Sequence, residues 1–420
     1  MFRTTLILGT LFISTAALAL PSHKHHLDLE LTGREYLDLL SKTPSKTTNK
    51  KIMTEEEVQI ERWLAIGKRN LQWVDFVNAS RSADRQLSLS SAATQNGNGP
   101  SAPRFYNFKL IKEKWGVVSD LLPKSLKAVV LEGKPFTTDL GVTDREFMEW
   151  LFQIDSAYQI AARYKLMLPY LEEMKGQAAY DVRGYLQLSD EENLDAKLSD
   201  FENLSDLKQS RLTRSLIMVC MNSEKKRPDC RKELNAALAN KSLVDFKNQY
   251  MPAGEGLYNY FFTIAGTRPD GVWTSADPNS LIFPFANPKN DAVLSFLRDN
   301  IEDEWKWEGW QLKLNFVDSE DPTMTHIVWE EGATPHVDNA PGTTITMDAN
   351  TPLSEYDVQW TIRHEYGHVI GFVDCYHEFY DEEEEAFVSY QLDVTNLMCS
   401  RRGKLKESHF TELKRAYFKE

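Results

Sequence analysis

The chain is short of cysteine, of positive charge and of long apolar runs. Its four cysteines are too few for a disulfide-dense scaffold, and they can pair in three ways. The 48 lysines and arginines are outnumbered by 62 aspartates and glutamates, which leaves a net charge of -14. Because this balance supplies no basic surface for nucleic acid or anionic lipid, we expect neither as a partner.

The composition is otherwise that of a globular protein. Of the 420 residues, 42% are hydrophobic, 11% aromatic and 26% charged, which argues against a wholly disordered or fibrous chain. The length is enough for about two or three domains, and no internal repeat is visible. The sequence carries no indication of the oligomeric state.

The N-terminus is typical of a secretory signal peptide. A short apolar stretch, residues 6–18, follows Arg3 and ends at the small residues Ala17 and Ala19. The alternative is a membrane anchor, although the stretch is short for one, and no later stretch approaches the roughly 18 apolar residues of a spanning helix. We therefore expect residues 1–19 to be removed and the mature protein to be secreted, periplasmic or extracellular, with no membrane span and with conditions that preserve disulfides.

Beyond the signal, the apolar pattern divides the chain into three parts. Residues 20–104 are predicted to form a leader, one amphipathic helix and a linker, and Thr54 starts the helix with a capping box. Residues 105–265 have mostly helical spacing and are predicted to form a helical domain, either a pro- or a regulatory domain. Its longest helices are expected over 144–168, 190–221 and 233–250. A disulfide across the polar loop between Cys220 and Cys230 is preferred to free thiols.

The third part, residues 270–420, mixes helix and strand patterns. Helices are expected over 291–307, 358–370 and 407–418, and strands over 311–317, 326–330 and 343–347. Ser354, together with Asp357, is expected to cap the second of these helices. The fold class is therefore predicted to be α+β, with a mostly helical N-terminal region followed by a small α/β domain.

The second of these helices carries the one pattern with evident chemistry, HExxH. Its histidines, His364 and His368, lie on one helix face and can reach a single tetrahedral metal ion. Glu365 projects at a neighbouring angle and can touch a water at the open position, as a general base does. Gly371 stands where the helix would end in a sharp turn, and Asp374 is placed to return as a third ligand.

Other interpretations of this site stay open. Asp374 could cap the turn and leave His377 as the third ligand. A glutamate of the acidic run 381–385 could supply that ligand from a second helix, as in the gluzincins. Ca²⁺ at the same run is a further option, although its spacing is not that of an EF-hand loop.

These residues resemble the metzincin-clan zinc metallopeptidases, whose pattern is HExxHxxGxxH followed by a methionine turn. The two histidines, the glutamate and the glycine match it, and Met398 stands at a suitable distance for the turn. The aspartate at the last position is similar to the snapalysin-type variant, HExxHxxGxxD. The resemblance covers roughly residues 280–420. It implies a mixed sheet, an active-site helix, a methionine turn and a C-terminal helix, with a substrate-pairing edge strand within 332–340.

The resemblance also implies an activity. The chain would be a secreted zinc-dependent endopeptidase acting on proteins or peptides, with Zn²⁺ held by His364, His368 and Asp374 and with Glu365 as general base. A secreted helical binding protein with a structural or degenerate zinc site is the second hypothesis. The intact glutamate favours the peptidase, because a structural site needs no base beside an open position.

Two more features belong to this resemblance. Cys375 follows the third ligand and Cys399 follows the turn methionine, so a disulfide between them would tie the ligand loop to the floor of the site. Many metzincins have a tyrosine two residues after that methionine, where this chain has Ser400, which leaves Tyr390 or His377 as candidates for its role. How such an enzyme would be kept latent is open, since a cysteine or an acidic side chain of the helical region could block the zinc.

Overall fold

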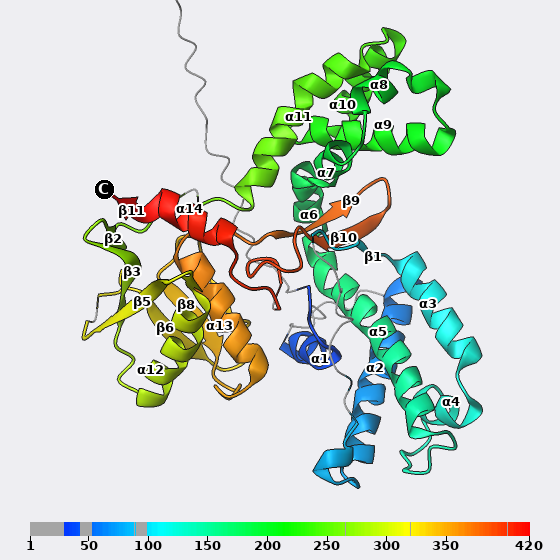
Figure 1. The fold of residues 1–420 in the computed structure, drawn as a ribbon. Helices are drawn as coiled ribbons and strands as arrows, with labels where there is room; N and C mark the ends of the chain where they lie inside the picture. Colours follow the sequence, from blue (N-terminus) through cyan, green and yellow to red (C-terminus); the bar gives the residue numbers. More distant parts are fainter. Residues whose placement is uncertain are drawn as a thin grey trace, which may run out of the picture.

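The computed structural model describes residues 29–42, 53–87, 89, 99–264, 266–319, 321–400 and 402–420. The predicted signal peptide lies outside these residues. Helix makes up 53% and strand 15% of the structure, so the predicted mixture of helices and strands is confirmed. Most helices come from the first two thirds of the chain, and the sheets lie mainly in the last third (Figure 1).

The helices α1 to α6 pack around one core. They span Gly33–Lys42 (α1), Glu55–Asn78 (α2), Phe108–Leu121 (α3), Lys124–Val130 (α4), Asp144–Met167 (α5) and Leu171–Gln177 (α6). The capping box at Thr54 is confirmed, because its side chain accepts from the backbone N–H of Glu57 and the Glu57 carboxylate accepts from the backbone N–H of Thr54. The segment predicted to be a leader contributes α1, which the sequence pattern did not indicate.

The helices α7 to α11 form a second group. They span Arg183–Ser189 (α7), Leu194–Ser199 (α8), Asp206–Met221 (α9), Arg227–Ala239 (α10) and Leu243–Tyr260 (α11). The single helices predicted over 190–221 and 233–250 are wrong, because Ser205 caps a new helix, α9, and Lys241, at φ 55°, separates α10 from α11. Apolar spacing continues across both breaks since the flanking helices bury against the same core. The disulfide between Cys220 and Cys230 is confirmed and joins α9 to α10.

Two linked sheets form the last third of the chain. Their strands are Val272–Thr274 (β2), Asp277–Ala286 (β3), Lys306–Trp307 (β4), Trp310–Val317 (β5), His326–Glu330 (β6), His336–Val337 (β7), Thr344–Asp348 (β8) and Phe418–Lys419 (β11). The strand orders are β11-β2-β3-β5-β4 and β6-β8-β7, and a parallel bridge between Phe285 and Thr325 links them. β3 is parallel to β5 and β6 to β8, whereas β7 is antiparallel to β8 at the sheet edge. The three predicted strands are confirmed as β5, β6 and β8.

Helices cover these sheets (Figure 1). They are Asp291–Leu297 (α12), Tyr356–Val369 (α13) and Glu407–Tyr417 (α14). The helix predicted over 291–307 is slightly too long: it continues through a π-helical turn, Arg298–Glu302, to residue 304, and Lys306 and Trp307 then pair as β4. The predicted cap at Ser354 is also wrong: Glu355 is the N-cap of α13, and no described side chain bonds to the helix end there.

A third sheet connects the helical part to the α/β part. The hairpin β9–β10, Tyr376–Asp381 and Ala386–Gln391, pairs through β10 with β1, Arg104–Tyr106. The acidic run 381–385 forms the end of this hairpin and not a second helix, so the gluzincin-type arrangement is wrong. Phe387 of β10 reaches the core of α1 to α6, while Val388 belongs to the other core.

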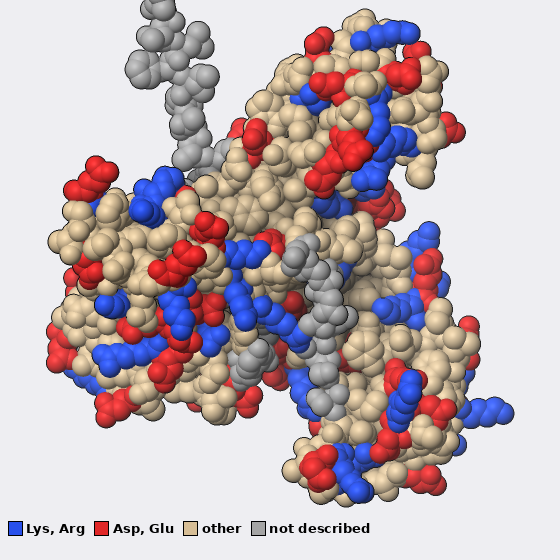
Figure 2. Space-filling view, viewed as in Figure 1, with Lys and Arg blue, Asp and Glu red and all other residues tan. Residues whose placement is uncertain are grey.

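The helices α7 to α11 share one continuous core with the sheets and α13. On the face in Figure 2, acidic and basic side chains are interspersed over both the helical and the α/β parts. None of the helices in the described ranges combines the length and the apolar character that a membrane crossing requires.

One buried ion pair joins the two parts. The guanidinium of Arg163 on α5 donates to the carboxylate of Glu378 on β9 at 2.6 Å, and both side chains are at most 1% exposed. Arg163 also donates to the hydroxyl of Tyr36 on α1.

Replacing Glu378 by alanine should lower the free energy of unfolding by about 3–5 kcal/mol, because it removes a buried carboxylate that pairs with the buried charge of Arg163. Urea unfolding followed by circular dichroism measures the change. The matched control is Glu149→Ala, which breaks the exposed Arg145–Glu149 pair and should leave the unfolding midpoint unchanged. Equal midpoints for Glu378→Ala and the wild type would contradict the expectation.

Candidate metal centre

The end of α13 turns the chain sharply back toward its own histidines. The backbone N–H of Gly371 donates to the carbonyl of His368 at 3.1 Å, and that of Phe372 donates to the carbonyl of Gly367 at 3.0 Å, which is a Schellman motif. Gly371 has φ 99°, and a Cβ there would lie 2.5 Å from the carbonyl oxygen of Gly266. Only glycine fits this position, so the predicted role of Gly371 in the turn is confirmed.

Three side chains meet beyond that turn. The carboxylate Oδ1 of Asp374 lies 3.0 Å from Nε2 of His364 and 3.3 Å from Nε2 of His368, and the two nitrogens are 3.2 Å apart. They are the group of potential metal ligands found among the described residues. The three side chains are 12–19% exposed, which leaves them a small opening to solvent. The predicted third ligand, Asp374, therefore lies beside both histidines.

Backbone carbonyls determine which way the two imidazoles face. Nδ1 of His364 donates to the carbonyl of Leu397 at 3.0 Å, and Nδ1 of His368 donates to the carbonyl of Phe372 at 2.9 Å. When the imidazoles are neutral, as metal binding requires, the single proton of each is on Nδ1, and both Nε2 lone pairs point toward the Asp374 carboxylate. Such carbonyl partners are the usual supports of metal-binding histidines.

The distances fit a zinc-sized cation. A tetrahedral ion with bonds of about 2.0–2.1 Å holds its ligand atoms roughly 3.3–3.4 Å apart, and the three observed separations are 3.0, 3.2 and 3.3 Å. Oδ1 of Asp374 is buried and has no hydrogen-bond partner within the described part of the chain. Two imidazoles and a carboxylate are a donor set that zinc accepts, and a fourth position remains for water or substrate.

The pKa values of the cluster indicate that the Asp374 carboxylate is ionised and needs a positive charge beside it. Burial alone would lower the pKa of His364, but its contact with Asp374 outweighs burial and raises that pKa to about 9. Burial opposes ionisation of Asp374 as well, yet the two histidines hold its pKa well below the usual range. The carboxylate therefore stays ionised, and either protons on the imidazoles or a metal ion must balance it.

Glu365 lies beside the ligands without joining them. Its side chain is 7% exposed, and burial raises its pKa, while the charges of His368 and His364 partly offset that rise. The charge of His336 on the edge strand β7 acts on it too, and α13 packs against β7 and β8. A carboxylate with a raised pKa next to a metal site is suited to accepting and returning a proton.

A tight turn, residues 396–399, lies under the site, and we call it the methionine turn. The side chain of Met398 packs directly beneath Gly367 of α13, where an added Cβ would lie 2.2 Å from its sulfur. The backbone N–H of Cys375 donates to the carbonyl of Met398 at 3.0 Å. The disulfide predicted between Cys375 and Cys399 is confirmed, so the turn and the ligand loop are joined covalently.

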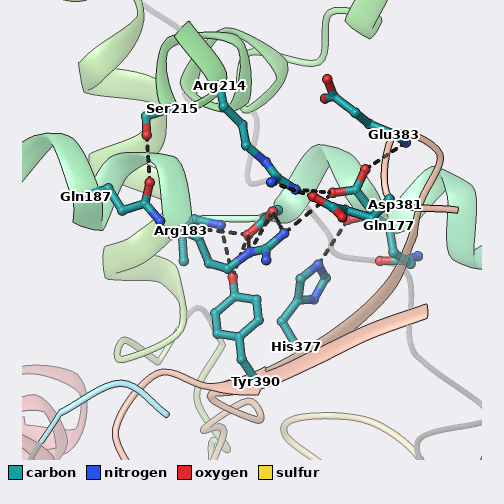
Figure 3. A network of polar contacts seen from close by, with 12 residues as sticks. Gln177, Arg183, Gln187, Arg214, Ser215, His377, Asp381, Glu383 and Tyr390 are labelled. Atoms are coloured by element: carbon teal, nitrogen blue, oxygen red, sulfur yellow. Dashed lines mark hydrogen bonds and ion pairs between the residues drawn. The ribbon is translucent and has the colours of Figure 1, made fainter. Parts of the chain in front are cut away.

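His377 and Tyr390, suggested as a third ligand and as helpers, lie in a different network (Figure 3). Nε2 of His377 donates to the carbonyl of Gln177 at 3.0 Å. The hydroxyl of Tyr390 donates to Asp181 at 3.0 Å and accepts from the backbone N–H of Val182. The network holds the hairpin against the helices, and both suggestions are therefore wrong.

The acidic end of the hairpin is occupied by arginines. Asp381 accepts from Arg214 at 3.3 Å (Figure 3). It also accepts from Arg227 at 3.4 Å. Glu383 pairs with Arg227 at 2.8 Å and with Arg231 at 3.2 Å. These carboxylates anchor the hairpin to α9 and α10, so they are not part of the metal cluster.

Sequence reasoning missed the residues that support the ligands. The supports are main-chain groups of Leu397 and Phe372 and the side chain of Asn396, which accepts from the backbone N–H of Met398 at 2.8 Å. An asparagine two residues before a turn methionine is a local turn signal that could have been found. The carbonyl contacts carry no signal in the residue types.

The segment 29–42 contacts the α/β part on two sides of the centre. The hydroxyl of Ser400, just after the methionine turn, donates to the carboxylate of Glu30 at 3.0 Å. At the other end, the ammonium of Lys42 donates to the carbonyl of Gly332, which precedes β7, at 2.7 Å. This segment thus links the methionine-turn side to the edge-strand side.

Comparison of the chain with protein-family models, with curated proteins and with solved structures finds no match in any of the three.

Replacing Gly367 by alanine should lower the free energy of unfolding by about 1–3 kcal/mol and weaken metal binding, because the new methyl group would displace Met398. The matched control is Gly116→Ala in α3, where nothing lies within 4 Å of the added atom. That change should raise stability by up to about 1 kcal/mol. Thermal unfolding and zinc titration of both variants test the pair, and similar behaviour of the two would count against this packing.

Proposed function

We propose that the protein is a secreted zinc-dependent metalloendopeptidase. The observation that carries the proposal is the arrangement of His364, His368 and Asp374, whose three ligand atoms face one another at the edge lengths of a zinc tetrahedron. Glu365 stands beside them, where a structural metal site would have no use for a base.

The chemistry follows from the donor set. When bound, Zn²⁺ would polarise a peptide carbonyl and make a water at the fourth position more acidic. The carboxylate ligand leaves the centre with a lower net charge than three histidines would, so proton removal depends more on Glu365. The Glu365 carboxylate would accept the proton of the attacking water and return it to the leaving amine.

The surrounding fold supports the metzincin resemblance. The antiparallel edge strand β7, His336–Val337, lies within 332–340, the range that the resemblance implies for a substrate-pairing strand. An extended peptide can add to such an edge through main-chain hydrogen bonds. A mixed sheet before α13 and a helix, α14, after the methionine turn also agree with the order of elements that the resemblance implies.

The disulfides and the N-terminal sequence support the secreted location that is part of the proposal. The two disulfides, Cys220–Cys230 and Cys375–Cys399, are stable outside the reducing cytosol, and the apolar N-terminal stretch has the form of a signal peptide. Protein or peptide substrates from outside the cell are then the expected targets.

Replacing Glu365 by glutamine should leave zinc binding intact and lower casein cleavage at least about 100-fold, because glutamine cannot accept the proton. Metal content by mass spectrometry and cleavage of labelled casein are measured on the same samples. The matched control is the variant Glu355→Gln, which changes an exposed residue at the start of the same helix. This variant should cleave casein like the wild type.

The outcomes separate the two function hypotheses. Zinc in both proteins with cleavage in the wild type alone supports the peptidase. Equal cleavage by wild type and Glu365→Gln removes the glutamate from the mechanism, and zinc without cleavage in either favours the binding protein.

We also infer that the segment 29–42 restricts the access of substrate to the metal cluster. The double variant Glu30→Ala and Lys42→Met removes the Glu30–Ser400 and Lys42–Gly332 hydrogen bonds, and each lost hydrogen bond shifts the open population by about fivefold. We expect kcat/KM for casein to rise. The matched control is Arg34→Ala, which removes a contact of α1 with Asp75 of α2 and should change nothing. Unchanged or lower activity in the double variant would contradict the inference.

A further inference from the structure

A buried histidine outside the ligand set stands out in α14. His409 is 3% exposed, although it contacts neither the metal ligands nor Glu365 in any hydrogen bond given by the structure. Its ring lies edge-on to Trp305 and Phe372, with centroids 6.1 and 5.3 Å away. Burying a polar ring costs free energy unless its nitrogens are hydrogen-bonded, so the partners of the two nitrogens matter.

The two nitrogens of His409 have different partners. The backbone N–H of Lys406 donates to Nδ1 at 3.0 Å, so Nδ1 has no proton. The proton is therefore on Nε2, which donates to Oδ1 of Asn396 at 3.0 Å. Burial and the charge of Lys406 lower the pKa of His409 to about 4, so the ring is neutral at physiological pH.

Asn396 passes this contact on to the methionine turn. Its Oδ1 also accepts from the backbone N–H of Met398 at 2.8 Å, and its main-chain carbonyl accepts from Cys399 at 3.0 Å. The side chain of Asn396 is 3% exposed, so water does not compete for these bonds. Both the side chain and the main-chain carbonyl of Asn396, the first residue of the methionine turn, therefore stabilise the turn.

Leu397 is the second residue of the methionine turn, and its carbonyl contacts His364 of the metal cluster. Its carbonyl, between Asn396 and Met398 in the chain, accepts the Nδ1 proton of His364 at 3.0 Å. Any shift of the turn moves this carbonyl and rotates the imidazole of His364, whose Nε2 faces Asp374. The aromatic ring of Trp305 adds a second connection, because its Nε1 donates to the carbonyl of Arg363, next to that histidine.

We propose that His409 and Asn396 are positioning residues for the metal centre, which together hold the Leu397 carbonyl so that Nε2 of His364 points at the metal position. The proposal rests on the proposed zinc site but not on peptide hydrolysis. It also explains why a helix at the end of the chain carries a buried neutral histidine.

The test is zinc affinity, measured by competition with a chromophoric chelator on the full-length protein. His409→Leu should weaken zinc binding by about 10–100-fold, the usual effect of losing such a support. His409→Gln, whose amide can replace the Nε2 donor, should remain within about threefold of the wild type. The control is His326→Leu on β6, which removes a structural histidine that bonds to Met324 and lies outside the metal cluster.

A double-variant comparison separates positioning from packing. Because His409 and Asn396 act in series, the variant His409→Leu with Asn396→Ala should lose no more zinc affinity than the worse single variant. The unfolding temperature of each metal-free protein is measured alongside. Loss of stability with unchanged zinc affinity would overturn the proposal, as would failure of His409→Gln to restore affinity.

The two proposals can fail separately. If the wild type binds zinc tightly and cleaves no casein, the peptidase assignment fails while these affinities still decide the positioning roles. If the wild type binds no zinc at all, the metal centre and the positioning proposal both fail. If His409→Leu does not fold, Asn396→Ala alone is expected to show the same loss of affinity, and wild-type affinity there would refute the proposal.

Discussion

Two imidazole nitrogens and a carboxylate oxygen directed at one point define this protein. Their lone pairs repel one another unless a positive charge lies between them, and the 3.0–3.3 Å separations are those of ligands around a small cation. Most of the local structure around α13 can be understood as holding these atoms in place. The Schellman turn brings Asp374 back, and main-chain carbonyls aim both histidines.

The support of the site comes from segments far apart in the chain. The methionine turn packs under Gly367, bonds to His364 through Leu397, and is tied to the ligand loop by the Cys375–Cys399 disulfide. α14 then holds the turn through His409. Each contact restrains an atom that would otherwise have to be ordered when a metal or substrate binds, which is how a site is made rigid before it acts.

The helical region is structurally continuous with this site. Residues 178–264 share their core with the sheets and α13. The hairpin that starts two residues after Asp374 is anchored by arginines of α7 and α9 (Figure 3) and by Arg227 of α10. The buried Arg163–Glu378 pair adds α5 to these anchors. Because the cores are continuous, removing the helical region would expose apolar side chains of the α/β part.

The sequence by itself determined the features that depend on near neighbours. Helical spacing puts His364 and His368 on one face, Gly371 permits the left-handed turn, and Thr54 with Glu57 forms a capping box. Only the tertiary structure showed that Asp374, and not His377 or the acidic run, lies beside the two histidines, because the strand β9 turns His377 toward Gln177 and arginines pair with the acidic run. The tertiary structure also showed that the segments 190–221 and 233–250 each contain more than one helix. Apolar spacing indicates which residues are buried against a core, but it does not show whether they belong to one continuous helix. The contact between the Leu397 carbonyl and His364 could not be predicted from the residue types, because every residue has a main-chain carbonyl. Only the folded structure shows which carbonyl lies close enough to hold the imidazole.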